Sequence, residues 1–344
     1  MKKQILSFAA LLLALLLAGC AASAPQSGSA ASASASASGA QPESAASGAQ
    51  PESAASGSAD ARAVTFTDAL GRTVTVESPK RVAALIGSFA DVWCLAGGKD
   101  TLVAAADDTW TQFELGLPET VVNLGGVKEP SAEALLAAQP DFVIGSAKTA
   151  ADVDLLPTLE QAGIPTAYFE VSTFEDYLAM LEVCTRVTGR PELYEQYGEQ
   201  VRAQVDAAVA RAEGKEGPSV LYLRATGSSC KVKNSENSVL GEMLAALGCV
   251  NIADSDASLL EELSMEAILA ADPERIFIVM QGSDQEKVRQ TLESAVLSNP
   301  AWQQLSAVKN GRVYYMDQQL YNLKPNARWG EAYEKLAEIL YGEA

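Results

Sequence analysis

The stretch SAEALLAAQPDFVI, residues 131–144, decides the fold because the chain contains it twice. A near copy, SMEAILAADPERIFI, occupies residues 264–278, and the two agree at seven of their first ten positions. The offset between them is 133 residues throughout. In each copy a short helical pattern stops at a proline, and a run of strand-forming residues follows. The duplication therefore predicts two similar α/β units with the copies at equivalent positions.

The sequence around both copies alternates strand patterns with helix patterns. In the first half, strands are expected at RVAALI (81–86), TLVAAA (101–106) and DFVIGS (141–146). In the second half they are expected at SVLYLRA (219–225), VNIA (250–253), RIFIVM (275–280) and RVYYM (312–316). Strands that alternate with helices are typical of parallel sheets covered by helices. We therefore expect an α/β fold with two Rossmann-like lobes, at 63–190 and 215–344.

Residues 191–214 are expected to form one connecting helix between the lobes. Pro191 suits a first helical turn, and apolar residues then recur every four positions from Leu193 to Val209. About 22 helical residues span roughly 33 Å, which is long enough to reach both lobes. A rigid connector of this kind predicts a ligand cleft between the lobes that is largely preformed.

The N-terminal 62 residues are expected to lie outside the fold. Residues 1–19 read as a signal peptide, whose apolar run at 5–19 is shorter than the roughly 20 residues of a spanning helix. The run ends in LAGC, which predicts lipid attachment at Cys20; an ordinary secretory signal is the alternative. Residues 20–62 are an Ala/Ser/Gly linker with two copies of GAQPESAAS, a composition that predicts disorder. The expected location is the outer face of the cell membrane, held by a lipid.

Charge and composition exclude several classes of function. The formal net charge is −19, which is unfavourable for binding nucleic acid. Histidine is absent, so a Ser-His-Asp triad, a Cys-His pair and a His-rich zinc site are impossible. Cys94, Cys184, Cys230 and Cys249 form no CxxC pair and are read as small buried residues, with a disulfide as the alternative.

The ordered part of the chain resembles the ABC-transporter substrate-binding proteins that take iron–siderophore complexes, haem or vitamin B12. The resemblance covers 64–344 and rests on VTFTDALGRTVTVESPKRVAAL (64–85), the stretch at 131–144, NPAWQQLSAVKNGRVYYMD (299–317) and KPNARWGEAYEKLAEILYG (324–342). It implies a monomer that delivers its ligand to a permease dimer with ATPase subunits. It also implies that Glu133 and Glu266 dock onto the two permease subunits. The alternative is that both glutamates only favour the first turn of a serine-capped helix.

Ligands of open α/β sheets bind outside the carboxyl ends of the strands, so the rim residues there are the candidates for ligand binding. Cations and aromatic side chains gather at this rim, which suits a bulky anionic ligand. The candidates are Ser88, Phe89, Trp110, Lys148, Arg224, Lys231, Lys233, Tyr321, Lys324 and Arg328. For each cation alone, a solvated loop residue is the alternative.

A siderophore chelates its own iron, so no cofactor and no metal ligand from the protein are expected. The resemblance implies that haem would be held by an axial histidine or tyrosine; since histidine is absent, only Tyr321 or another tyrosine could serve. A ferric siderophore is therefore the favoured ligand, with haem and cobalamin as alternatives. A secreted enzyme on the same scaffold is the competing function, but the chain has no nucleophile elbow, phosphate loop or metal-ligand motif. A sensor or scavenger without a permease is a third possibility.

Overall fold

The computed structural model describes residues 63–342. Cys20, the signal peptide and the Ala/Ser/Gly linker lie outside the described residues, so the expectations for them stay predictions. Within the described part, no helix is both long and apolar enough to cross a membrane.

The first lobe contains a sheet of five parallel strands with the order β5-β4-β3-β6-β7. Their bounds are β3 (Val82–Ala84), β4 (Leu102–Ala105), β5 (Val122–Asn123), β6 (Phe142–Ser146) and β7 (Thr166–Phe169). The helices of this lobe are α1 (Gly87–Leu95), α2 (Asp108–Thr111), α3 (Ala132–Ala137), α4 (Ala150–Asp154), α5 (Leu156–Gln161) and α6 (Phe174–Thr188). An antiparallel hairpin, β1 (Ala63–Thr67) and β2 (Thr73–Glu77), precedes them.

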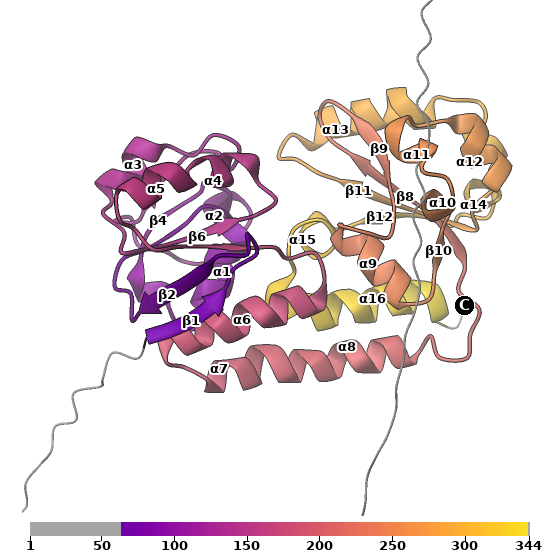
Figure 1. Cartoon of the computed structure of the whole chain (residues 1–344). Coiled ribbons are helices and arrows are strands. Elements are labelled where there is room, and N and C mark those ends of the chain that lie inside the picture. The colour runs from indigo at the N-terminus through magenta and orange to yellow at the C-terminus, as the bar shows by residue number, and fades with distance from the viewer. Residues whose placement is uncertain (1–62, 343–344) are drawn as a thin grey trace, which may run out of the picture. The chain divides into compact units, whose positions relative to one another are not determined.

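The second lobe repeats this plan (Figure 1). Its sheet has the order β10-β8-β11-β12 in parallel, with β9 antiparallel to β8. The strands are β8 (Ser219–Ala225), β9 (Cys230–Lys233), β10 (Val250–Asn251), β11 (Arg275–Met280) and β12 (Val313–Met316). The helices are α9 (Val239–Ala246), α10 (Ile252–Ser255), α11 (Ser258–Glu261), α12 (Met265–Ala271), α13 (Gln285–Leu292), α14 (Ser306–Lys309), α15 (Gln318–Tyr321) and α16 (Trp329–Tyr341). The predicted two-lobe α/β class is confirmed.

The duplicated stretch has the same structure in both lobes. Each copy forms a short helix (α3 or α12) followed by a strand (β6 or β11). Just before these strands, the side chain of Asp141 accepts a hydrogen bond from the backbone N–H of Arg81 at 2.8 Å. The side chain of Glu274, 133 residues later, accepts one from the N–H of Ser219 at 3.1 Å. In each lobe a carboxylate thus fixes the start of the strand next to the repeat.

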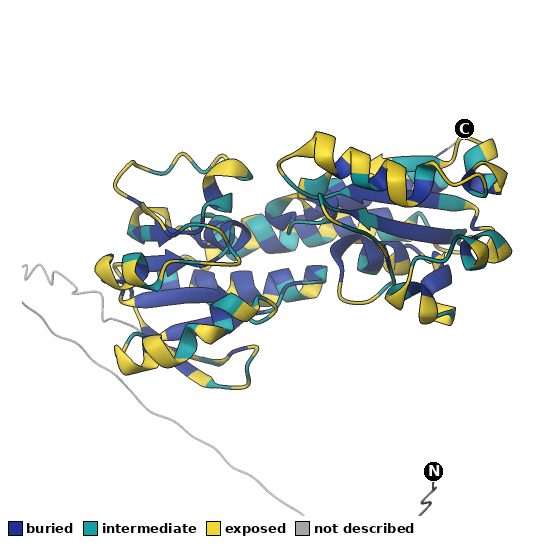
Figure 2. Cartoon of the chain, turned by 90° about the horizontal axis from the view of Figure 1, so that it is seen from above, coloured by how far each residue is buried: buried dark blue, intermediate teal, exposed yellow. Residues whose placement is uncertain are grey.

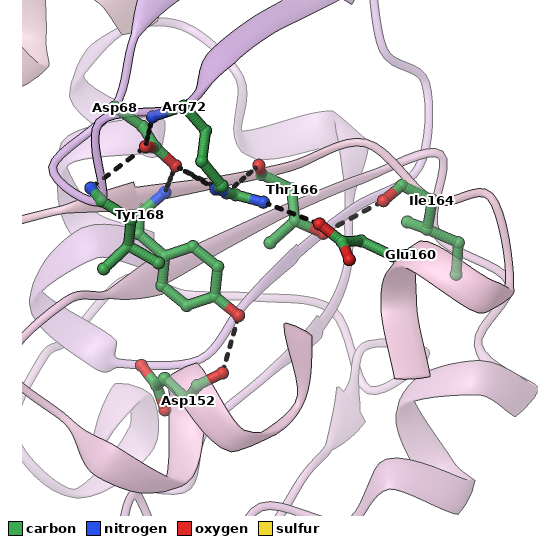
Figure 3. Close-up of polar contacts among 8 residues, drawn as sticks. Asp68, Arg72, Asp152, Glu160, Ile164, Thr166 and Tyr168 are labelled. Atoms are coloured by element: carbon green, nitrogen blue, oxygen red, sulfur yellow. Dashed lines mark hydrogen bonds and ion pairs between the residues drawn. The ribbon is translucent and has the colours of Figure 1, made fainter. Parts of the chain in front are cut away.

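The hairpin at the entry is attached to the first sheet by an ion pair between the buried Asp68 and the half-buried Arg72 (Figure 3). The Asp68 carboxylate accepts hydrogen bonds from the Arg72 guanidinium and from the backbone N–H of Tyr168 in β7. The Arg72 guanidinium also donates to the carbonyl of Thr166 at 2.9 Å. The TDALGR stretch (67–72) therefore has a structural role: Arg72 and neighbouring backbone N–H groups supply the hydrogen-bond donors that the buried carboxylate of Asp68 needs.

The connector is helical from Glu192 to Ala210, but it is not a regular α-helix. It consists of α7 (Glu192–Tyr194), a π-helical segment η2 (Glu195–Glu199) and α8 (Gln200–Ala210). Gly198 lies in the π segment, and a Cβ there would come within 3.3 Å of Leu178 in α6. The wider turn and the glycine let the connector pack closely on α6. The single connecting helix expected over 191–214 is thus seen as one helical segment over 192–210, with a π turn in its first half.

One apolar core runs through both lobes. It contains Val82 of β3 and Tyr222 of β8, and joins them through α6, α8 and α16, for example at Leu181, Val205 and Leu336. Figure 2 shows buried strands in both sheets beneath helices whose outer faces are exposed. The lobes are therefore two sheets on one shared helical base.

A buried asparagine adds a polar connection at this base. Asn326 has φ +54° and is 1 % exposed. Its amide donates to the carbonyl of Ser88 and to the carboxylate of Asp91 in α1, each at 2.8 Å. Burial raises the pKa of Asp91, and the hydrogen bond from Asn326 partly opposes this effect. The segment before α16 is thereby fixed to the first lobe.

We expect Asn326→Ala to lower the free energy of unfolding by about 2–4 kcal/mol, because two buried acceptors lose their donor and alanine is strained at positive φ. Urea denaturation measures this change. The control is Asn322→Ala, which removes a half-buried amide nearby and should change stability by less than about 0.5 kcal/mol. Equal effects of the two substitutions would contradict the proposed tether.

Candidate ligand-binding site

The carboxyl edges of the two sheets face each other, as contacts on two sides show. Beyond β4, the Gln112 side chain accepts a hydrogen bond from Gln318 at 2.9 Å, and its carbonyl accepts one from Gln319 at 2.8 Å. Beyond β6, the Lys148 ammonium donates to the side chain of Asn237, before α9, at 3.4 Å. We call the region between these contacts the inter-lobe site.

Three cations of the second lobe share one face of its sheet. Arg224 in β8 lies opposite Lys231 in β9, and Tyr222 lies opposite Lys233. Opposed residues of an antiparallel pair point to the same face, and so do residues two apart. The pKa of Lys233 is lowered by burial and by the charges of Arg224 and Lys231. The three side chains are therefore close enough to repel one another.

Lys324 brings a fourth cation to the same place. This half-buried lysine lies between α15 and Asn326. Burial lowers the pKa of Lys324, and the charge of Arg224 lowers it further, whereas Asp108 and Glu170 of the first lobe act in the opposite direction. Lys324 therefore feels charges from both lobes. Among the described residues, no ion pair involves Arg224, Lys231, Lys233 or Lys324.

The first lobe contributes two buried or half-buried carboxylates at the centre of its sheet edge. Asp108, after β4, accepts a hydrogen bond from the N–H of Gly87 at 2.8 Å, and burial raises the pKa of Asp108 to about 6. The fully buried Asp152 accepts one from the N–H of Ser146 at 2.8 Å, and burial raises its pKa to about 7. The charge of Asp108 raises the pKa of Asp152 further. This edge thus holds less negative charge than two free carboxylates would.

Four of the predicted rim residues are accessible to a ligand. Trp110 is 40 % exposed in α2, and Lys231 is exposed. Lys148 is exposed but forms an ion pair with Glu170 at 2.8 Å. Arg328 is also exposed, and its guanidinium pairs with Glu331 at 2.7 Å, which raises the pKa of Arg328.

Three expected ligand contacts are corrected, because their side chains lie in the core. Ser88 and Phe89 belong to the first turn of α1, and Phe89 is 0 % exposed against the ring of Phe169. Tyr321 is 3 % exposed, and its hydroxyl donates to the carbonyl of Ala332 at 3.0 Å. Tyr321 is therefore unsuited to be an axial ligand of haem.

The sequence analysis missed four polar residues that face the inter-lobe site or bridge it: Asp108, Gln112, Glu170 and Asn237. Glu170 directly follows β7, and Asp108 lies three residues after the end of β4, so their position after these strands was the available signal. Nothing in the local sequence marks Gln112 or Asn237, because their partners lie more than 80 residues away.

Glu133 and Glu266 lie at equivalent, exposed positions in the first turns of α3 and α12. The serine before each helix caps it: Ser131 accepts a hydrogen bond from the N–H of Ala134 at 3.1 Å, and Ser264 accepts one from Ala267 at 3.2 Å. The expected serine caps are confirmed. Neither glutamate forms an ion pair with another described residue.

The four cysteines of the described part are unpaired, in line with the favoured reading of them as small residues without disulfides. Two of them, Cys184 and Cys249, are buried. No group of three or more acidic or cysteine side chains among residues 63–342 is arranged to hold a metal ion.

The match to a known family agrees with this architecture. The family model for "Periplasmic binding protein" matches residues 82–320. The chain belongs to the periplasmic binding protein family. This family consists of binding proteins rather than enzymes, and its matched region contains both sheets up to α15.

Relatives of this periplasmic binding protein are named for Fe(3+)-citrate, vitamin B12 and siderophores. An Fe(3+)-citrate-binding protein of Bacillus subtilis is 26 % identical over 269 residues, which cover 76 % of this chain and 79 % of the relative. A vitamin B12-binding protein of Vibrio parahaemolyticus is 23 % identical and is covered over 87 % of its length, against 74 % of this chain. A solved siderophore-binding protein in complex with acinetobactin and ferric iron has a TM-score of 0.64 at 19 % identity, with 82 % of this chain and 100 % of that chain covered.

The raised pKa of Asp152 predicts a pH dependence of stability. A carboxyl whose pKa is raised on folding stabilises the fold in its protonated form, so this contribution is complete below pH 4 and is lost as pH rises through about 7. In the wild type the free energy of unfolding should fall between these pH values. In Asp152→Asn this fall should be smaller, by on the order of 2 kcal/mol. Urea denaturation at pH 5 and pH 8 measures it.

Asp154→Asn is the matched control, because Asp154 lies in the same helix with an exposed side chain. It should leave the pH dependence unchanged. A parallel shift of the Asp152→Asn curve at both pH values would show that packing, and not titration, is responsible.

Proposed function

We propose that this protein captures an anionic ferric chelate of the siderophore type outside the cell and delivers it to an ABC importer. The observation that carries the proposal is a group of four cations at the inter-lobe site that form no ion pair with any residue of 63–342: Arg224, Lys231, Lys233 and Lys324. Like charges gathered in one place repel one another, most strongly at the half-buried Arg224, Lys233 and Lys324, and an anion offsets this repulsion. An iron chelate with several carboxylates or phenolates supplies such an anion.

The comparison among ligands favours an iron chelate over haem and cobalamin. Tyr321 was the predicted axial ligand for haem, but its side chain is buried, and the chain has no histidine to take its place. Cobalamin offers little negative charge for four cations. The B. subtilis relative named for Fe(3+)-citrate supports a carboxylate-rich chelate. Haem- or cobalamin-binding is the alternative function in the same class, and a secreted enzyme on this scaffold is the more distant one.

We expect Arg224→Gln and Lys324→Gln each to weaken the binding of ferric citrate by about 10- to 100-fold, since each removes a charge-assisted contact from a partly desolvated site. Quenching of tryptophan fluorescence measures the Kd, because Trp110 adjoins the site. Lys309→Gln, which removes an exposed charge at the end of α14, is the control and should bind like the wild type. Equal binding by all variants would overturn the assignment of the cations.

The same proposal includes docking of Glu133 and Glu266 to two permease subunits. Each is an exposed carboxylate without an ion-pair partner among the described residues, and the two are related by the repeat. The permease would be served by an ATPase pair, and a monomeric binding protein anchored through Cys20 would supply one docking face per lobe. Relatives from B. subtilis carry the name ABC transporter substrate-binding lipoprotein, which supports this arrangement.

The double variant Glu133→Ala/Glu266→Ala should bind ferric citrate normally but lower cellular uptake of ⁵⁵Fe-citrate by about tenfold or more, because two desolvated charge pairs are lost. The single variants should lower it less. Glu334→Ala, an exposed glutamate on α16, is the control. Unchanged uptake by the double variant would contradict docking and would mean that these glutamates only stabilise the first turns of their helices.

A further inference from the structure

Glu170 holds an unusual place among the cations of the inter-lobe site. It follows β7 directly, at the carboxyl edge of the first sheet. Its carboxylate pairs with the Lys148 ammonium at 2.8 Å, and the two side chains are 37 % and 54 % exposed. Glu170 is therefore accessible to solvent and is not locked in the core.

The partners of Glu170 reach across to the second lobe. The Lys148 ammonium that it holds also donates to Asn237 at 3.4 Å. The charge of Glu170 acts on Lys324 as well, against the effect of Arg224. One carboxylate thus offsets positive charge on two separate segments, after β6 and before α16.

This placement is the one that a carboxylate of an anionic ligand would take. A ligand carboxylate would form charge-assisted contacts with the same ammonium groups. Glu170 pairs directly with Lys148 at 2.8 Å, and its charge also acts on the half-buried Lys324. Glu170 and such a ligand group compete for the same cations. Binding then requires that the ligand supply more negative charge than Glu170 gives up.

We propose that Glu170 is an internal counter-ion that a carboxylate of the ligand displaces, and that it restricts the site to chelates with several negative charges. The inference rests on the proposed function and assigns a residue that sets its specificity. A chelate with one negative charge exchanges one ion pair for another and gains little, whereas a multiply charged chelate also reaches Arg224, Lys231 and Lys233.

The test compares Glu170→Gln with the wild type, using ferric citrate and the cationic hydroxamate chelate ferrioxamine B as probes. Glutamine keeps the size and hydrogen bonding of the side chain but removes its charge. The control is Glu160→Gln, which removes the same charge from the same lobe, where Glu160 lies 3.6 Å from Arg72 and is 62 % exposed. Thermal unfolding confirms that all three proteins are folded.

We expect Glu170→Gln to bind ferric citrate about three- to tenfold more tightly, with a steeper loss of affinity as salt rises, because more uncompensated cations face the ligand. Ferrioxamine B should bind the variant no better than the wild type, and Glu160→Gln should match the wild type with both probes. Metal-free citrate should also gain affinity on Glu170→Gln, since the inference concerns charge and not iron.

Two outcomes would overturn the inference in distinguishable ways. Unchanged or weaker binding of ferric citrate by Glu170→Gln, with a wild type that binds it, would show that Glu170 braces the site or contacts the ligand directly, and the proposed function would stand. A wild type that binds neither ferric citrate nor other anionic iron chelates would overturn the proposed function and the inference together.

Discussion

The structure depends on one constraint: a single apolar core joins both sheets through three helices, α6, α8 and α16. Separating the lobes would expose the faces of these helices to water, at roughly 25 cal/mol for each Å² of apolar surface. Asn326 adds a buried polar connection at the same base. The two sheet edges that carry the inter-lobe site are therefore joined by the folding core itself, which favours a cleft that is largely preformed.

On this rigid base, the distribution of charge opposes the net charge of the chain. The chain carries −19 overall, which repels an anionic chelate at a distance. At physiological salt the Debye length is about 8 Å, so the distant carboxylates are largely screened once the chelate is near. The partly desolvated cations, Arg224, Lys233 and Lys324, are screened much less. Local cations thus decide binding, while the acidic surface limits nonspecific contact with anionic polymers.

The arrangement of the lobes was predictable from sequence because it depends on local periodicity and on the repeat. The strand expected at 219–225 matches β8 residue for residue. The side chains of the site were less predictable. The local sequence around Phe89 and Tyr321 predicts loops at the sheet rim. In the structure both side chains point into the core, where Phe89 contacts Phe169 and the Tyr321 hydroxyl donates to the Ala332 carbonyl. The π segment of the connector likewise follows from close packing on α6, which no local pattern reveals.

The repeat itself shows where the two lobes remain alike and where they differ. At the amino ends of the sheets, Asp141 and Glu274 accept equivalent backbone hydrogen bonds at the start of β3 and β8. At the carboxyl ends the likeness stops: the first lobe presents Asp108 and Glu170, whereas the second presents the cations around Arg224. The two lobes thus share a fold but carry different charges at their carboxyl sheet edges. This suits a protein with one docking face per lobe and a ligand bound in one orientation. An anionic chelate would lie against the second lobe, and the first lobe would contribute Lys148 once its own carboxylate has been displaced.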